Sequence, residues 1–119
     1  MDRDMDVIRK IVLATKEAKR VDISAIEGID NETFCLNALL LIEAGLVKGR
    51  VLASGDSAIP EVVDIFRLTW EGCDFADSIV DPGLWDKAKE HVIKPGVSWT
   101  FTILCTYLKA LAAEKLGIQ

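Results

Sequence analysis

The sequence has few of the residue types that build metal and catalytic centres. Its 119 residues include one histidine, His91, and three cysteines, Cys35, Cys73 and Cys105. No two cysteines form a CxxC pair, so the spacing lacks the paired ligands of a disulfide framework or a structural zinc site. We expect three small core or surface thiols and an ordinary surface or helix-capping histidine.

Long apolar runs are also missing. The most apolar stretch, "WTFTILCTYLKALAA" at residues 99–113, is interrupted by Lys109 and falls short of the roughly 20 residues that span a bilayer. The first ten residues, "MDRDMDVIRK", are charged and contain no apolar segment typical of an export signal. We therefore expect a soluble, cytoplasmic protein with no membrane contact.

Motifs that carry catalysis are absent as well. The chain has no phosphate-binding glycine loop, no HExxH and no histidine near a candidate nucleophile. Three carboxylates, Glu71, Asp74 and Asp77, recur at every third position and could form a divalent-metal or acid–base pair. Since no other ligand type joins them, a solvated acidic helix face is the favoured interpretation. We expect no catalytic residue, no metal, no cofactor and no enzymatic activity.

Basic residues are scarce in the middle of the chain. Residues 21–86 hold thirteen acids and three bases, Lys48, Arg50 and Arg67, for a net charge of −10. The flanking segments, residues 1–20 and 87–119, sum to +2 and +3. Duplex binding depends on lysine and arginine to neutralise phosphates, so this charge weakens a DNA-binding hypothesis without excluding it.

Two helices are predicted in the N-terminal part, residues 3–18 and a segment that begins after the N-cap Asp30 and ends before Gly45. One side of the first helix is apolar at helical spacing: Met5, Ile8, Ile11, Val12 and Thr15. Between the helices, "VDISAIEG" predicts a short turn element.

A β-hairpin is predicted next. Residues 46–53 and 61–69 form two strands, and the turn-rich segment "SGDSAIP" joins them. In the second strand, Val62, Phe66 and Leu68 alternate as the expected buried side.

The segment "LTWEG" predicts where the hairpin passes into a helix. The hydroxyl of Thr69 can cap a helix that begins at Trp70, and Gly72 lets that helix pack close to the strand it leaves. The expected inward side of this helix consists of Trp70, Cys73, Ala76 and Val80, with Phe75 and Ile79 beside it.

Two further helices complete the chain, one from Asp81-Pro82 to Lys94 and one capped by Ser98. The last helix has two apolar stripes. The first stripe comprises Phe101, Leu104, Leu108 and Leu111, and the second comprises Ile103, Tyr107 and Ala110. The second stripe predicts a homodimer through residues 99–116, unless Trp85 and Val92 of the preceding helix cover it within one chain.

The order helix, turn, helix, hairpin, helices is that of a winged helix-turn-helix. The fold class is therefore α+β and mostly helical, with two to three helices, a β-hairpin wing and C-terminal helices. We expect a single domain over residues 1–119, with helices and wing in residues 1–69 and a helical extension in residues 70–119. The segments "AGLVKG" and "RLTWEG", which bracket the hairpin, indicate this arrangement.

Four segments, "RDMDVIRKIVL", "LLIEAGLVKG", "LTWEGCDFADSI" and "WDKAKE", resemble domain-of-unknown-function family 2513, a set of small bacterial and phage proteins. The resemblance implies a winged-helix fold and an origin in phage or mobile elements, and therefore a bacterial or host cytoplasm. It implies no activity, substrate or catalytic residue. The chain departs from the family pattern at Cys35 and Cys73, where histidine is usual.

The outer side of the second helix carries no side chain suited to reading base edges: Glu32, Thr33, Leu36, Leu40 and Glu43. It is either a protein contact or a surface that the C-terminal helices cover. The leading hypothesis is a non-enzymatic acidic winged-helix protein that binds another protein, including a host-interaction or DNA-mimic inhibitor role. The alternative is a DNA-binding transcriptional regulator with wing contacts from Lys48 and Arg50. A third is a metal-dependent enzyme.

Overall fold

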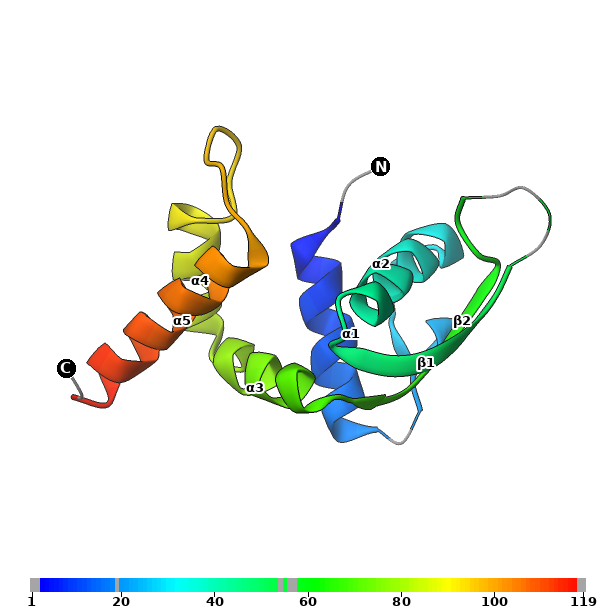
Figure 1. The fold of residues 1–119 in the computed structure, drawn as a ribbon, viewed down its shortest axis with the longest axis horizontal. Coiled ribbons are helices and arrows are strands. Elements are labelled where there is room, and N and C mark those ends of the chain that lie inside the picture. The colour runs from blue at the N-terminus through cyan, green and yellow to red at the C-terminus, as the bar shows by residue number, and fades with distance from the viewer. Residues whose placement is uncertain (1–2, 19, 54, 56–57, 118–119) are drawn as a thin grey trace. The chain divides into compact units, whose positions relative to one another are not determined.

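The computed structural model describes residues 3–18, 20–53, 55 and 58–117, and these form an α+β chain that is mostly helical (Figure 1). Part of the predicted turn, Ser54, Asp56 and Ser57, lies outside the described residues. The elements follow in the order α1 (Met5–Glu17), the 3₁₀ helix η1 (Ile23–Ala25), α2 (Asn31–Glu43), β1 (Val47–Leu52), β2 (Val62–Leu68), α3 (Trp70–Ile79), α4 (Pro82–His91) and α5 (Phe101–Lys115).

The chain forms two compact units, which we call the N-terminal unit (Met1–Ala76) and the C-terminal unit (Asp77–Gln119). The division falls within α3, so the helix belongs in part to each unit. The expectation of one domain divided after residue 69 stays a prediction, because compactness alone does not show which segments fold independently.

In the N-terminal unit the expected cap of α2, Asp30, is confirmed, and α1 has a cap, Asp4, that the sequence analysis did not name. Asp4 caps α1 by accepting the backbone N–H groups of Asp6 and Val7 at 3.1 and 3.2 Å. Asp30 caps α2 by accepting the N–H of Thr33 at 3.1 Å. After α2, Gly45 adopts a φ of 76°, the left-handed conformation that glycine reaches without steric strain.

The hairpin is an antiparallel pair with one irregularity. Lys48 pairs with Arg67 and Gly49 pairs with Ile65, so Phe66 is the extra residue of a β-bulge. On the other side of β2, Val21 and Ile65 exchange two backbone hydrogen bonds of 2.8 Å each. The segment between α1 and η1 therefore adds one β-bridge to the two-stranded sheet.

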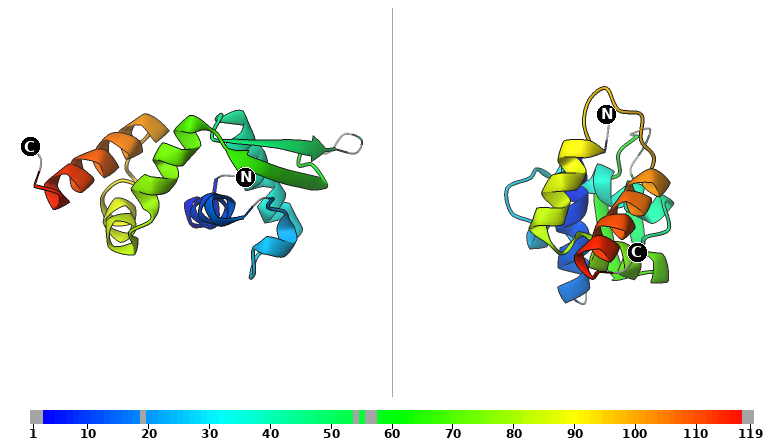
Figure 2. Two further views of the ribbon diagram at one scale, coloured as in Figure 1. Left: turned by 90° about the horizontal axis from the view of Figure 1, so that it is seen from below. Right: turned by 90° about the vertical axis from the view of Figure 1, so that its left-hand side faces the viewer.

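Helices cover the sheet of the N-terminal unit to form its core. Helix α1 packs against α2 and β2, and α2 packs against η1 and both strands (Figure 2). The largest fully buried side chains of this unit come from α1, α2, α3, both strands and the segment between α1 and η1. They are Ile11, Val12, Val21, Phe34, Leu41, Val47, Val63, Ile65 and Phe75. All five residues predicted for the inner side of α1 are buried.

The predicted buried side of β2 is wrong. Val62 and Phe66 are 43% and 45% exposed and Leu68 is half-buried, whereas Val63 and Ile65 are almost fully buried. The segment "VVDIFRL" has apolar residues in both alternating phases, so periodicity could not select the inner one. The pairing of Ile65 with Val21 places the other phase in the core.

The predicted inner side of α3 is also wrong in phase. Trp70 is 81% exposed and Cys73 and Val80 are exposed, while Phe75 is 2% exposed as expected. The buried residues Gly72, Phe75, Ala76 and Ile79 recur at i, i+3, i+4 and i+7. This phase follows from Gly72, which faces the backbone of Leu46 and thereby turns Trp70 away from the core.

The C-terminal unit contains a pair of packed helices, α4 and α5. Asp81 caps α4 by accepting the N–H groups of Gly83 and Leu84 at 2.8 and 3.3 Å, as expected. The cap of α5 is Thr100, whose hydroxyl accepts the N–H of Ile103 at 3.2 Å, and the predicted cap Ser98 is wrong. The last helix accordingly begins at Phe101, later than the sequence indicated.

Candidate functional site

The junction of hairpin and α3 is built by Thr69 and Gly72. The Thr69 hydroxyl accepts the N–H of Gly72 at 3.1 Å and donates to the carbonyl oxygen of Gly45 at 2.6 Å. The backbone N–H of Thr69 donates to the carbonyl of Leu46 at 3.0 Å. Thr69 therefore caps α3, as predicted, and also fastens α3 to the bend between α2 and β1.

The outer side of α2 is apolar and acidic. Glu32 and Glu43 are exposed, and Thr33, Leu36 and Leu40 are half-buried. Helix α2 contains no lysine and no arginine. The interpretation that C-terminal helices cover the two leucines stays a prediction.

The expected wing cations differ in their surroundings. Lys48 is exposed on β1. The Nε of Arg50 lies 3.0 Å from Oδ2 of Asp64, directly across the hairpin. The third base of the central segment, Arg67, donates from Nη1 to the carbonyl oxygen of Leu68 at 3.0 Å.

Asp64, on β2, is a buried carboxylate with a side chain 5% exposed. Its Oδ2 accepts hydrogen bonds from Arg50 Nε and, at 2.6 Å, from Arg20 Nη2. These bonds from Arg50 and Arg20 hold the pKa of Asp64 below its ordinary value, against the opposing effect of burial. Sequence reasoning missed this cluster, because Arg20 and Asp64 are 44 positions apart.

Asn37 is a second polar group that the sequence analysis passed over. It is 1% exposed, its Oδ1 accepts the N–H of Asp4 at 2.9 Å, and its Nδ2 donates to the carbonyl of Thr33 at 2.9 Å. The side chain thus joins the start of α1 to α2. A lone amide in the apolar segment "CLNALLLI" was the available signal.

The three predicted acidic residues Glu71, Asp74 and Asp77 are exposed on α3. Within the part of the chain that the structure describes, no group of three or more histidine, cysteine, aspartate or glutamate side chains is placed to hold a metal ion. Asp74, one helical turn after Trp70, lies on the same side of α3 as this tryptophan, which is the most exposed large hydrophobic side chain among the described residues.

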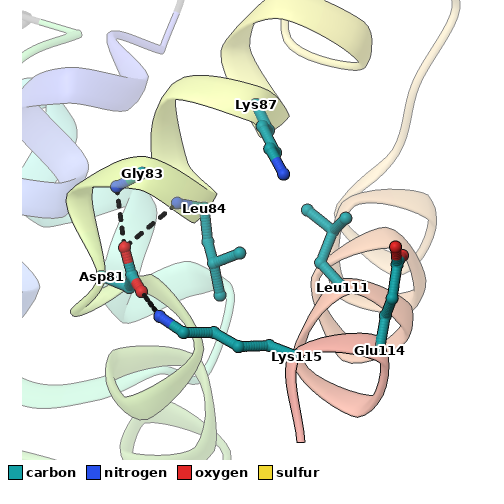
Figure 3. Close-up of a pocket in the computed structure, with 7 residues that line it drawn as sticks. All are labelled: Asp81, Gly83, Leu84, Lys87, Leu111, Glu114 and Lys115. Atoms are coloured by element: carbon teal, nitrogen blue, oxygen red, sulfur yellow. Dashed lines mark hydrogen bonds and ion pairs between the residues drawn. The ribbon is translucent and has the colours of Figure 1, made fainter. Parts of the chain in front are cut away.

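A hollow of about 370 Å³ lies between α4 and α5 in the C-terminal unit (Figure 3). Its lining combines Leu84 and Leu111 with charged groups that include Lys87 and Glu114. Lys115 forms an ion pair with Asp81 at one side of it. Hydrogen bonds, first from Lys115 and then from the backbone of α4, lower the pKa of Asp81.

A comparison with models of known protein families shows which family the chain belongs to. The model of a family described as "Hypothetical protein (DUF2513)" matches residues 2–98. The chain belongs to the DUF2513 family. No significant match was found among curated proteins or among solved structures.

The predicted dimer surface of this DUF2513 member is partly covered within the chain. Ile103 is 48% exposed, Ala110 is exposed and Tyr107 is half-buried. The ring of His91, in the last turn of α4, lies 6.3 Å from the Tyr107 ring, centroid to centroid. Helix α4 thus reaches the second stripe through His91, and the homodimer stays a prediction.

No helix in the described part of the chain is long and apolar enough to cross a bilayer.

The three thiols of this DUF2513 member are free and differ in exposure, which predicts different reactivity. Cys73 is exposed, whereas burial raises the pKa of Cys35 and of the half-buried Cys105. We expect one rapid reaction with Ellman's reagent in the folded protein, a slower one at Cys105, and reaction of Cys35 only on unfolding. The Cys73→Ser variant should lose the rapid phase, and its persistence would contradict the placement of α3.

Proposed function

We propose that the N-terminal unit is a winged-helix module that binds a protein partner and not duplex DNA. The element order supports the winged helix: α1, the β-bridge residue Val21, η1, α2 and then the hairpin. In this arrangement α2 holds the position of a recognition helix and β1–β2 is the wing.

The lack of available cations on these two elements carries the proposal. Helix α2 has no lysine or arginine, and its exposed ends carry Glu32 and Glu43. On the wing, Arg50 is paired with Asp64 and Arg67 donates to the carbonyl oxygen of Leu68, which leaves Lys48 as the cation best placed for a phosphate. A duplex would meet this acidic surface with few compensating contacts.

The same surface suits a basic protein partner. Leu36 and Leu40 supply half-buried apolar area between two acids, the usual composition of a protein contact. The resemblance to this family implies an origin in phage or mobile elements, and on that basis the proposal includes a host-interaction role, such as inhibition of a nucleic-acid-binding factor by DNA-like negative charge. The module then needs no catalytic residue.

A gel-shift experiment with random duplex tests the choice between partners. We expect no sub-micromolar complex at about 150 mM salt, because too few cations face a duplex. Sub-micromolar binding of a duplex would reject the proposal and favour a DNA-binding regulator that uses Lys48 and Arg50.

Charge reversal on α2 tests the protein-binding surface. The double variant Glu32→Lys/Glu43→Lys should lose any protein that the parent retains from a host lysate. Glu90→Lys/Glu114→Lys, at exposed sites on α4 and α5, is the matched control because it adds the same positive charge. Equal retention by both variants would move the contact away from α2.

A further inference from the structure

Trp70 is exposed because the fold holds it outward. It is the first residue of α3 and 81% of its side chain is exposed. Turning α3 to bury Trp70 would move Gly72 away from the carbonyl of Leu46, where no Cβ fits. It would also break the bond from Gly72 to the Thr69 hydroxyl. The approach of Gly72 to the Leu46 carbonyl and the hydrogen bond from Gly72 to Thr69 therefore keep the Trp70 side chain in solvent.

Tryptophan is an unusual choice for such a position. Its large apolar surface favours burial, and tryptophan is enriched in protein–protein contacts relative to the rest of the protein surface. The structural role of the segment needs only Thr69 and Gly72, since the Trp70 side chain takes no part in the cap. The indole is thus available for a role outside the fold.

The neighbours of Trp70 on α3 define what it can bind. Asp74 follows Trp70 by four residues and Glu71 by three, so its side chain neighbours both on the surface of α3, whereas Trp70 and Glu71 themselves point about 100° apart. All three residues are exposed. Negative charge beside an aromatic face favours a cation, because the ring attracts the cation and the carboxylates pair with it. The same carboxylates repel a phosphate.

We propose that Trp70, Glu71 and Asp74 form a contact for an arginine- or lysine-bearing segment of a protein partner. The guanidinium or ammonium group lies over the indole and pairs with the adjacent carboxylates. This inference rests on the proposed function, since it names the chemistry of the partner, but it uses a different surface from α2. Figure 1 shows α3 leaving the end of β2 directly, at the base of the hairpin.

Titration of a fluorescent nona-arginine peptide, followed by anisotropy at low salt, tests the contact. We expect Trp70→Ala to weaken binding about fivefold, and Trp70→Phe to weaken it less, because phenylalanine retains an aromatic face. The double variant Glu71→Gln/Asp74→Asn should also weaken binding and make it less dependent on salt. Leu52→Ala, which removes a side chain 63% exposed on the hairpin, should bind as the parent does.

Two results would overturn the contact: no binding of the peptide, or equal affinity for the parent and Trp70→Ala. Preferential binding of a single-stranded oligonucleotide through Trp70 would also overturn it, since base stacking would then replace cation recognition. Failure of the proposed function is seen separately in the duplex gel shift. If the protein binds duplex DNA while Trp70→Ala still weakens peptide binding, only the proposed function is rejected. If the protein binds no duplex and Trp70→Ala binds the peptide as the parent does, only this contact is rejected.

Discussion

Gly72→Val is expected to destabilise the protein by about 3 kcal/mol or more. A Cβ at this position would lie 1.9 Å from the carbonyl oxygen of Leu46 and 2.9 Å from its carbon. These are backbone atoms, so no side-chain rotation relieves the overlap. The Leu46 carbonyl also accepts the N–H of Thr69, so a shift of the backbone would disturb the cap of α3.

Gly83→Ala is the matched control, because Gly83 also lies in the first turn of a helix. Its nearest neighbour would be Oδ1 of Asp81 at 3.2 Å, a side-chain atom. We expect a change within about 1 kcal/mol, since alanine favours helix more than glycine does. Urea unfolding followed by circular dichroism measures both variants. A Gly72→Val variant as stable as the parent would refute the close approach of α3 to Leu46.

The second large effect is expected at Asp64. Asp64→Ala removes the shared acceptor of Arg20 and Arg50, whereas either arginine variant leaves the carboxylate one partner. We therefore expect the melting temperature to fall more for Asp64→Ala than for Arg20→Ala or Arg50→Ala. Equal losses in all three variants would show that the two arginines act only together.

The pH dependence of stability should report the same group. Folding lowers the pKa of Asp64, so its contribution is fully present above the ordinary value of 3.8. That contribution is lost as the pH falls through the lower, folded-state pKa. Between about pH 6 and about pH 3, the parent should lose more stability than Asp64→Asn. Both should still lose some, because the pKa values of Asp30 and Asp81 are also lowered.

Local signals in the sequence predicted local structure well. Asp30, Thr69 and Asp81 cap the helices they were expected to cap, because capping depends on a few consecutive residues. Gly45 and Gly72 were also identified from their neighbours. The α+β class followed from the order of these signals, whereas the family followed from the resemblance of four short segments.

Features that depend on distant partners could not be predicted. The phase of β2 is set by Val21, and the sequence offers two apolar phases for it. The burial of Asp64 depends on Arg20, which approaches only when α1 and the hairpin are both in place. The exposure of Trp70 follows from a contact between Gly72 and Leu46, and hydrophobicity alone favoured the opposite result.

The free edge of the hairpin gives Lys48 and Arg50 a different significance. Within the described residues β1 pairs only with β2, so its outer edge presents backbone groups to any passing strand. Charged side chains and bulges are the usual protection of such an edge against intermolecular strand pairing. Lys48 and Arg50 flank Gly49, opposite the bulge at Phe66. Positive charge on a wing can therefore serve to keep the protein soluble without any contact to DNA. Replacing both Lys48 and Arg50 with valine should promote aggregation.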